Sequence, residues 1–281
     1  MNIQKIKEKA QQVLNMNKPQ YMRILLMIAL LELIPNLLNI GEDILSNLLY
    51  IIISIAFMAV SHGYIVSSLK MVRNQSMMLA NDDAFVGFKR FKELFSTYLL
   101  KNIFTVVPSM IMVLISSIFL GLFIAGASSG LSSQAVLSND YTQIISSVAN
   151  LPASVLGAFM LVYLIIVILI VVISSYLFAV SYLLERYHMT NMNAIKESFR
   201  LMKGHIWDVI KLELSFLGWM VLVILVQSVI GELLAFLPIL GSLIASIIAS
   251  VVGVYTYLPR YHLSKAIFFE ELAYYRYEQT N

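Results

Sequence analysis

The sequence contains no cysteine. Disulfides, thiolate metal sites, cysteine nucleophiles and lipid anchors attached to cysteine are therefore excluded. Charge is also scarce: Asp, Glu, Lys and Arg make up 12% of the 281 residues, whereas hydrophobic residues make up 59% and the mean hydropathy is +0.83. Because an ordinary soluble domain carries about 25% charged residues, this composition indicates a chain that lies largely in lipid.

Signatures of chemistry are missing as well. The four histidines, His62, His188, His205 and His262, form no metalloprotease helix motif, and no two of them share a ligand-like spacing. There is no nucleophile elbow and no phosphate-binding loop. We therefore predict no metal, no cofactor and no catalytic residue, and we expect a protein that is not an enzyme.

Six long apolar runs dominate the sequence. They cover residues 22–40, 48–69, 99–126, 153–184, 212–236 and 241–258. A transmembrane helix needs about 17–25 such residues, so each run predicts one span. The fourth run is longer than a bilayer requires and is expected to tilt, to kink near Ser174 and Ser175, or to project into the cytoplasm. The predicted fold is an all-α, polytopic helical bundle that forms a single membrane domain, residues 1–281.

The positive charges predict the orientation of the spans. All 19 Lys and Arg residues lie before or at the start of the first run, between the second and third or at the start of the third, between the fourth and fifth, or after the sixth. The opposite loops and span ends carry Glu42, Asp43, Asp140 and Glu232. Since cytoplasmic loops are enriched in Lys and Arg, we expect both termini, including a tail at residues 259–281, in the cytoplasm of the plasma membrane. Cations dispersed in this way do not indicate nucleic-acid binding.

Amphipathic segments precede several spans and resemble one another. Ile6-Lys7-Glu8 lies in a predicted amphipathic helix at residues 3–16 and precedes the first run, and Ile195-Lys196-Glu197 precedes the fifth run at nearly the same spacing. Such recurrence indicates a repeated hairpin unit with amphipathic helices at the cytoplasmic face.

The segment from residue 81 to residue 95 combines phenylalanines at helical spacing with three cations, Lys89, Arg90 and Lys92. It is expected to lie on the inner leaflet. One interpretation is contact with anionic lipid or with a partner; the other is an anchor that fixes how a hairpin enters the bilayer.

Small residues recur along the sixth run. Gly241, Ala245, Ala249 and Gly253 are four positions apart and would lie on one helix face. Such a face lets two helices approach closely, either within this chain or between two copies of it.

A carboxylate inside an apolar run is costly, so Glu32 is a candidate functional residue. Two interpretations remain open: a proton or cation site in a polar cavity, or an interhelical hydrogen bond. The polar residues expected at comparable depth are Ser174, Ser175, Ser246 and Ser250, with Gln227 as a further intramembrane candidate.

The stretch Asn193-Ala194-Ile195-Lys196-Glu197-Ser198-Phe199, followed by Ser215-Phe216-Leu217-Gly218-Trp219 and by the late Tyr257-Leu258-Pro259, resembles an integral-membrane family of Gram-positive bacteria, domain of unknown function 975. The same helix-then-span pattern is similar to the membrane domain of some glycerophosphodiester phosphodiesterases. The resemblance implies a bacterial plasma-membrane protein and transfers no catalytic residue.

Three functional hypotheses follow. The first is a non-enzymatic scaffold, regulatory or protective factor of the envelope. The second is a transporter or channel for a small solute or ion, with Glu32 in a polar cavity. The third, which has least support, is an intramembrane enzyme that acts on lipid. The expected partners are the bilayer, anionic inner-leaflet lipids and an unidentified membrane protein.

Overall fold

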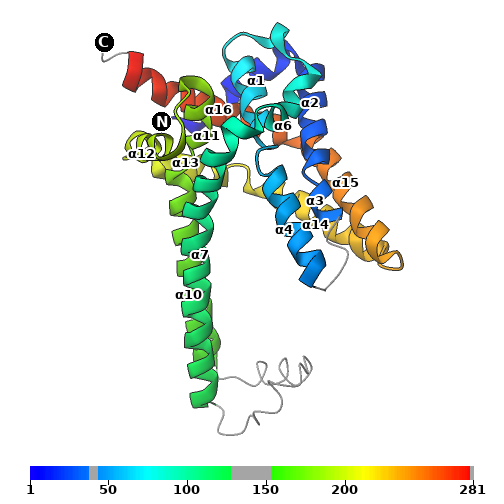
Figure 1. Ribbon diagram of the computed structural model, residues 1–281, viewed down its shortest axis with the longest axis vertical. Helices are drawn as coiled ribbons and strands as arrows, with labels where there is room; N and C mark the ends of the chain where they lie inside the picture. Colours follow the sequence, from blue (N-terminus) through cyan, green and yellow to red (C-terminus); the bar gives the residue numbers. More distant parts are fainter. Residues whose placement is uncertain (38–43, 128–152, 279–281) are drawn as a thin grey trace. The chain divides into compact units, whose positions relative to one another are not determined.

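The computed structural model describes residues 1–37, 44–127 and 153–278, and the regular structure in these ranges is helical, without a strand (Figure 1). This confirms the all-α prediction. The end of the first predicted span, residues 38–40, and the last residues of the predicted tail lie outside these ranges.

The elements follow one another in this order: α1 (Ile3–Met16), α2 (Lys18–Leu31), α3 (Ile34–Leu37), α4 (Ile44–Phe57), α5 (His62–Val72), η1 (Ser76–Met78), η2 (Asn81–Phe85), α6 (Val86–Lys89), α7 (Phe91–Ala127), α10 (Ala153–Tyr176), α11 (Val180–Tyr187), α12 (Asn191–Met202), α13 (Ile206–Leu214), α14 (Leu217–Leu233), α15 (Pro238–Thr256), α16 (Leu258–Ala273) and η3 (Tyr274–Glu278). The chain divides into two compact units. Unit 1 comprises Met1–Lys101 and Ser175–Asn281, and unit 2 comprises Asn102–Ser174.

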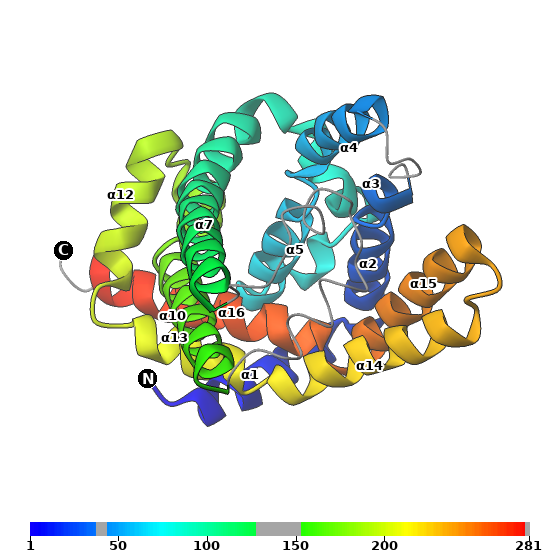
Figure 2. The same cartoon turned by 90° about the horizontal axis from the view of Figure 1, so that it is seen from below.

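The buried core of unit 1 is built from its amphipathic helices. In α1 the residues Ile6, Ala10, Val13 and Leu14 are buried, and this spacing places them on one helix face. Helix α16 contacts α1, α5, α15, α2 and α13, and Figure 2 shows it running between α1 and α5. Much of the predicted C-terminal tail is thus the central helix of the core.

The apolar helices, in contrast, bury little of their surface. In unit 1, no residue of α14 is buried, although the helix is almost entirely hydrophobic. In unit 2, Ile111, Leu114 and Leu164 are each at least half exposed. Large contiguous apolar surfaces of this kind are rare on soluble monomers, and the natural solvent for them is lipid.

The number of candidate spans is three to five. Leu45–Val72, Phe91–Ser117 and Met160–Tyr187 are each long and apolar enough to cross a membrane. Two bent helix pairs, Ile206–Leu214 with Leu217–Leu233 and Leu240–Thr256 with Leu258–Tyr277, add two spans if each pair counts as one. These helices indicate a membrane protein.

The first of the six predicted runs is not among these candidates. Helix α2 ends at Leu31, and Glu32 and Leu33 form a turn in which the Leu33 N–H donates to the Leu30 carbonyl at 3.2 Å. The short helix α3 follows, and the run continues into residues outside the described ranges.

Short turns interrupt the helices at five places, two of which lie within the candidate spans Leu45–Val72 and Met160–Tyr187. We call these turns the helix breaks; they comprise Glu32–Leu33, Met58–Ser61, Leu177–Ala179, Ser215–Phe216 and Tyr257. The two bent pairs turn by 45° and 57° at the last two breaks. The third break follows directly after Ser174 and Ser175, the place where the sequence suggests a kink.

Hydroxyl groups satisfy backbone carbonyls that the helix ends expose. Ser198 of α12 donates to the Tyr176 carbonyl at 2.7 Å, and Ser215 donates to the Leu212 carbonyl at 2.7 Å. Because the last carbonyls of a helix have no partner within it, such bonds stabilise a break in a poorly hydrated environment.

Gly87 lets α6 approach the break at Met58–Ser61. A Cβ atom at this position would collide with the Ala59 carbonyl and lie 2.8 Å from the Val60 Cα. Both obstacles are backbone atoms, which cannot rotate away.

We therefore expect Gly87→Ala to lower the free energy of unfolding by about 1–3 kcal/mol, as overpacking does in other cores. Gly218→Ala is the matched control, because a Cβ there meets no atom within 4 Å. Equilibrium unfolding in mixed detergent micelles measures both. An equal effect of the two substitutions would contradict the close approach at Gly87.

Candidate functional site

The most extensive buried polar contacts of unit 1 surround His62, the first residue of α5. The side chain is fully buried. Its Nδ1 lies 2.8 Å from the Tyr98 hydroxyl, and its Nε2 lies 3.0 Å from Glu185 Oε2. The arrangement is satisfied by a neutral ring in which Tyr98 donates to Nδ1 and Nε2–H donates to Glu185. Three segments distant in sequence therefore meet at one imidazole.

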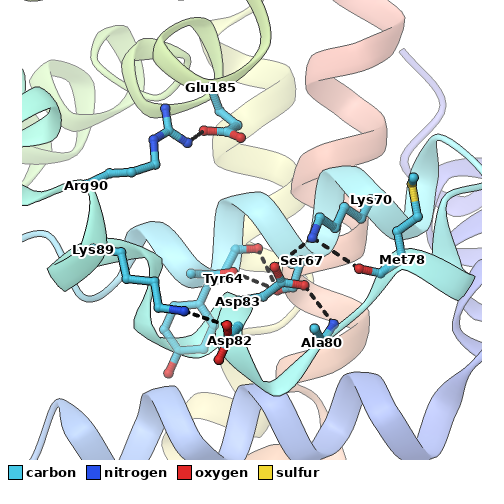
Figure 3. Close-up of polar contacts among 11 residues, drawn as sticks. Tyr64, Ser67, Lys70, Met78, Ala80, Asp82, Asp83, Lys89, Arg90 and Glu185 are labelled. Carbon is cyan, nitrogen blue, oxygen red and sulfur yellow. Dashed lines mark hydrogen bonds and ion pairs between the residues drawn. The ribbon is translucent and has the colours of Figure 1, made fainter.

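Arg90 completes this network. Its Nη1 donates to Glu185 Oε2 at 2.6 Å, and its Nε and Nη2 donate to the two carboxylate oxygens of Glu93 at 2.9 and 2.7 Å. Figure 3 shows the guanidinium of Arg90 directed at Glu185. The hydrogen bonds to Glu93, opposed by partial burial and supported by Glu185, raise the pKa of Arg90 above its ordinary value. We call His62, Arg90, Glu93, Tyr98 and Glu185 the His62 network.

The chemistry of this network is that of a link between helices. Both nitrogens of His62 have partners, and Glu185 accepts from both His62 and Arg90. A general base must have a nitrogen or oxygen available to a substrate proton. Within the described ranges, no group of three His, Asp or Glu side chains is placed to hold a metal ion.

Glu32 belongs to a second polar group at the helix breaks. The Tyr64 hydroxyl donates to Glu32 Oε2 at 3.2 Å, and the Tyr64 ring stacks on His262 with the ring centroids 4.2 Å apart. Glu32 lies at the first break, Tyr64 follows the second, and His262 follows the last. The partner of Glu32 is thus a tyrosine rather than one of the candidate serines.

The other intramembrane candidates do not gather at one site. Gln227 of α14 donates to Ser246 of α15 at 3.1 Å, and Ser250 donates to the Ser246 carbonyl at 2.8 Å. Ser175 is buried in unit 1, whereas Ser174 is exposed on α10 in unit 2. The structure therefore joins Gln227 with Ser246, and these two residues lie apart from the hydrogen bond of Glu32.

The small residues of the sixth run lie at close contacts within the chain. Ala245 and Ala249 are buried, as are Gly241 and Gly253. A Cβ at Gly241 would collide with the Leu234 carbonyl at the end of α14. Helices α14 and α15 lie side by side in Figures 1 and 2, and α15 also contacts α2.

The basic segment around residue 90 is largely neutralised by its own carboxylates. Lys89 pairs with Asp82, and Lys70 donates to Asp83 at 2.6 Å (Figure 3). Asp83 also accepts from the Ala80 N–H at 3.1 Å and so caps η2. Of the three cations suggested for lipid contact, Lys89 and Arg90 are ion-paired, whereas Lys92 is exposed.

Sequence reasoning missed the roles of Tyr98 and Glu185. Glu185 and His62 are 123 positions apart, and no periodicity connects them. The available signal is the position of Tyr98 and Glu185. Tyr98 directly precedes the apolar run at 99–126, and Glu185 directly follows the run at 153–184. At such a position a titratable group must find a partner or water.

The amphipathic helices form a buried core, and they continue into apolar helices long enough to cross a bilayer. This architecture is that of a helical membrane protein. The chain belongs to the family described as Protein of unknown function (DUF975), whose family model matches residues 1–275. No curated protein and no solved structure matches the chain.

If the His62 network links the helices, Arg90 and Glu185 are energetically coupled. We expect the double-mutant cycle of Arg90→Gln and Glu185→Gln to give a coupling free energy of about 1 kcal/mol or more. The measurement is equilibrium unfolding in mixed micelles. The control is the Lys89→Gln and Asp82→Asn cycle, because that exposed pair should contribute about 0–1 kcal/mol. Equal coupling in both cycles would count against a linking role.

Proposed function

We propose that this protein is a non-enzymatic, multi-pass protein of a bacterial plasma membrane that serves the envelope as a scaffold, regulatory or protective factor. The observation that carries the proposal is the His62 network. Its polar groups bind one another across α5, α7 and α11, so the buried polarity of unit 1 fixes the relative positions of helices.

The proposal includes six spans with both termini in the cytoplasm. The helix breaks support it, because one of the two helices at each break carries Lys or Arg and the other carries none. The helices with Lys or Arg are α2, α5, α11, α13 and α16, and their apolar neighbours are α3, α4, α10, α14 and α15. A positive face next to apolar spans is typical of the cytoplasmic side.

A repeated hairpin unit is also part of the proposal. The order α1, α2, break, α3 parallels the order α12, α13, break, α14, and each series returns through an apolar helix and a break to an amphipathic helix, α5 or α16. The likeness to the membrane domain of glycerophosphodiester phosphodiesterases rests on this same alternation, whereas the likeness to Gram-positive proteins rests on the motifs at residues 193–199, 215–219 and 257–259.

A scaffold or regulator acts through a partner. We expect a tagged chain, extracted from native membranes in mild detergent after brief cross-linking, to carry the same second protein in a reproducible stoichiometry. The R90Q/E185Q variant should remain in the membrane fraction but no longer carry that second protein. Without the Arg90–Glu185 contact, the helices would not keep the relative positions that form the binding surface.

Two controls make this result decisive. Lys89→Gln changes a neighbouring, exposed charge and should leave the complex intact. Repeated isolation of the wild-type chain without a stoichiometric partner, under conditions that preserve other membrane complexes, would contradict the proposal.

Transport of a small solute or ion is the second candidate function, and the group of Glu32, Tyr64 and His262 favours it. Three titratable side chains from three helix breaks come together there. If these residues line a hydrated path, a membrane-impermeant reagent must reach it.

The absence of cysteine makes this prediction directly testable. Single cysteines at Glu32, Ser174 and Ser250, probed in intact and opened cells with a small charged thiol reagent, should remain unlabelled if the interior is dry. Cysteines at Gly204 and Ser133 are controls, expected to label from the inside and the outside, respectively. Labelling at Glu32 would favour transport, and reversed labelling of the controls would refute the orientation.

A further inference from the structure

A cavity of about 210 Å³ lies between the α1–α2 corner and the junction of α15 with α16, entirely within unit 1. Gln11, Lys18, Thr256 and Arg260 are among its polar lining residues, and no carboxylate is among the residues that line it. Pockets for drug-sized ligands usually measure about 300–1,000 Å³, so this cavity suits a smaller group.

The two cations of the cavity differ from three half-buried cations of the core. Lys70, Arg90 and Lys265 each have a carboxylate partner. Lys18 is exposed, and Arg260 donates to the Thr256 backbone carbonyl at 3.1 Å. Across the described ranges, no carboxylate pairs with either of them. Two positive charges therefore face one cavity without compensation, which favours an anion.

Both cations of the cavity lie at the start of a helix. Lys18 is the first residue of α2, and Arg260 lies in the first turn of α16. No side chain caps either helix: Asn17, the residue before α2, instead donates to the Ser76 carbonyl at 2.9 Å. Helix N-termini carry a partial positive charge, but each of these two ends follows the C-terminus of another helix after one residue, and that C-terminus carries a partial negative charge. The attraction of an anion therefore depends mainly on the two side chains.

Apolar residues also line the cavity. Leu14, Met22 and Val254 are among them, and Val254 lies near the end of α15, within a candidate span. Tyr255, which also lines the cavity, is 69% exposed, as is common for tyrosines at a membrane interface. Cationic side chains lie here beside the end of an apolar helix that belongs to a candidate span. This combination matches a molecule with a charged head and a hydrocarbon body.

We propose that this cavity binds the phosphate-bearing headgroup of an anionic phospholipid. Lys18 and Arg260 hold the phosphate, the side-chain amide of Gln11 donates a hydrogen bond to the headgroup, and the acyl chains leave along α15. The inference is independent of the scaffold proposal, and it places the lipid contact away from the Lys89–Lys92 segment, where carboxylates of the protein neutralise two of the three cations.

Native mass spectrometry of the delipidated, detergent-solubilised full chain tests this site. The probes are phosphatidylglycerol, phosphatidylcholine with the same acyl chains, and inorganic phosphate. We expect the wild-type chain to retain one phosphatidylglycerol and to bind phosphatidylcholine about tenfold more weakly or worse. The K18Q/R260Q variant should lose about tenfold in affinity for phosphatidylglycerol, since two charge-assisted contacts are removed.

The matched control is K92Q/K203Q, which removes two exposed cations elsewhere and should change the affinity less than about twofold. Thermal unfolding verifies that both variants fold; if K18Q/R260Q does not, Lys18→Gln alone is compared with Lys203→Gln. Three results would each overturn the proposal: unchanged binding in the folded Lys18 variant, equal binding of the two lipids, or displacement of phosphatidylglycerol by millimolar phosphate.

Discussion

A polar group at the end of an apolar helix must find a partner within the protein, and unit 1 is organised by this constraint. Where a helix breaks, its last carbonyls lose their intrahelical hydrogen bonds, and nearby titratable side chains lose part of their hydration. Ser198 supplies a hydroxyl to the Tyr176 carbonyl, and Glu185 accepts from both His62 and Arg90. Because these partners come from other helices, meeting the requirement at one break also positions its neighbours.

Hydrophobic periodicity and composition predict much of this architecture. The amphipathic pattern at residues 3–16 coincides with α1, and the turn at Leu177–Ala179 lies close to Ser174 and Ser175, where a kink is one of the three outcomes expected for the long run at 153–184. The other breaks are harder to predict, since hydropathy describes side chains and is nearly unchanged where the backbone turns at Ser215–Phe216. The partners of Glu32 and Glu185 depend on contacts between distant segments, which a single sequence does not encode in any local pattern.

The distribution of positive charges along the sequence predicts which side of the membrane each loop faces. It does not distinguish the roles of individual cations. Lys70 and Lys265 are bound by carboxylates of the core, whereas Lys18 and Arg260 face a cavity that no carboxylate lines. In the sequence all four are simply basic residues near apolar runs. The structure separates cations that stabilise the fold from cations whose charge remains available to a ligand.

The position of α16 gives the Lys18–Arg260 cavity an influence beyond its own residues. This helix contacts α1, α2, α5, α13 and α15, so its first turn, which carries Arg260, is continuous with the centre of the core. At the other end of the chain, Arg276 and Tyr277 donate to Glu197 of α12. Burial opposes ionisation of Glu197, but these two hydrogen bonds hold its pKa below the usual range, so this link to α12 persists at neutral pH. An anion bound at the start of α16 therefore contacts a helix that packs against both the N-terminal and the C-terminal elements of unit 1. The free energy of anion binding then stabilises the packing of these elements around α16.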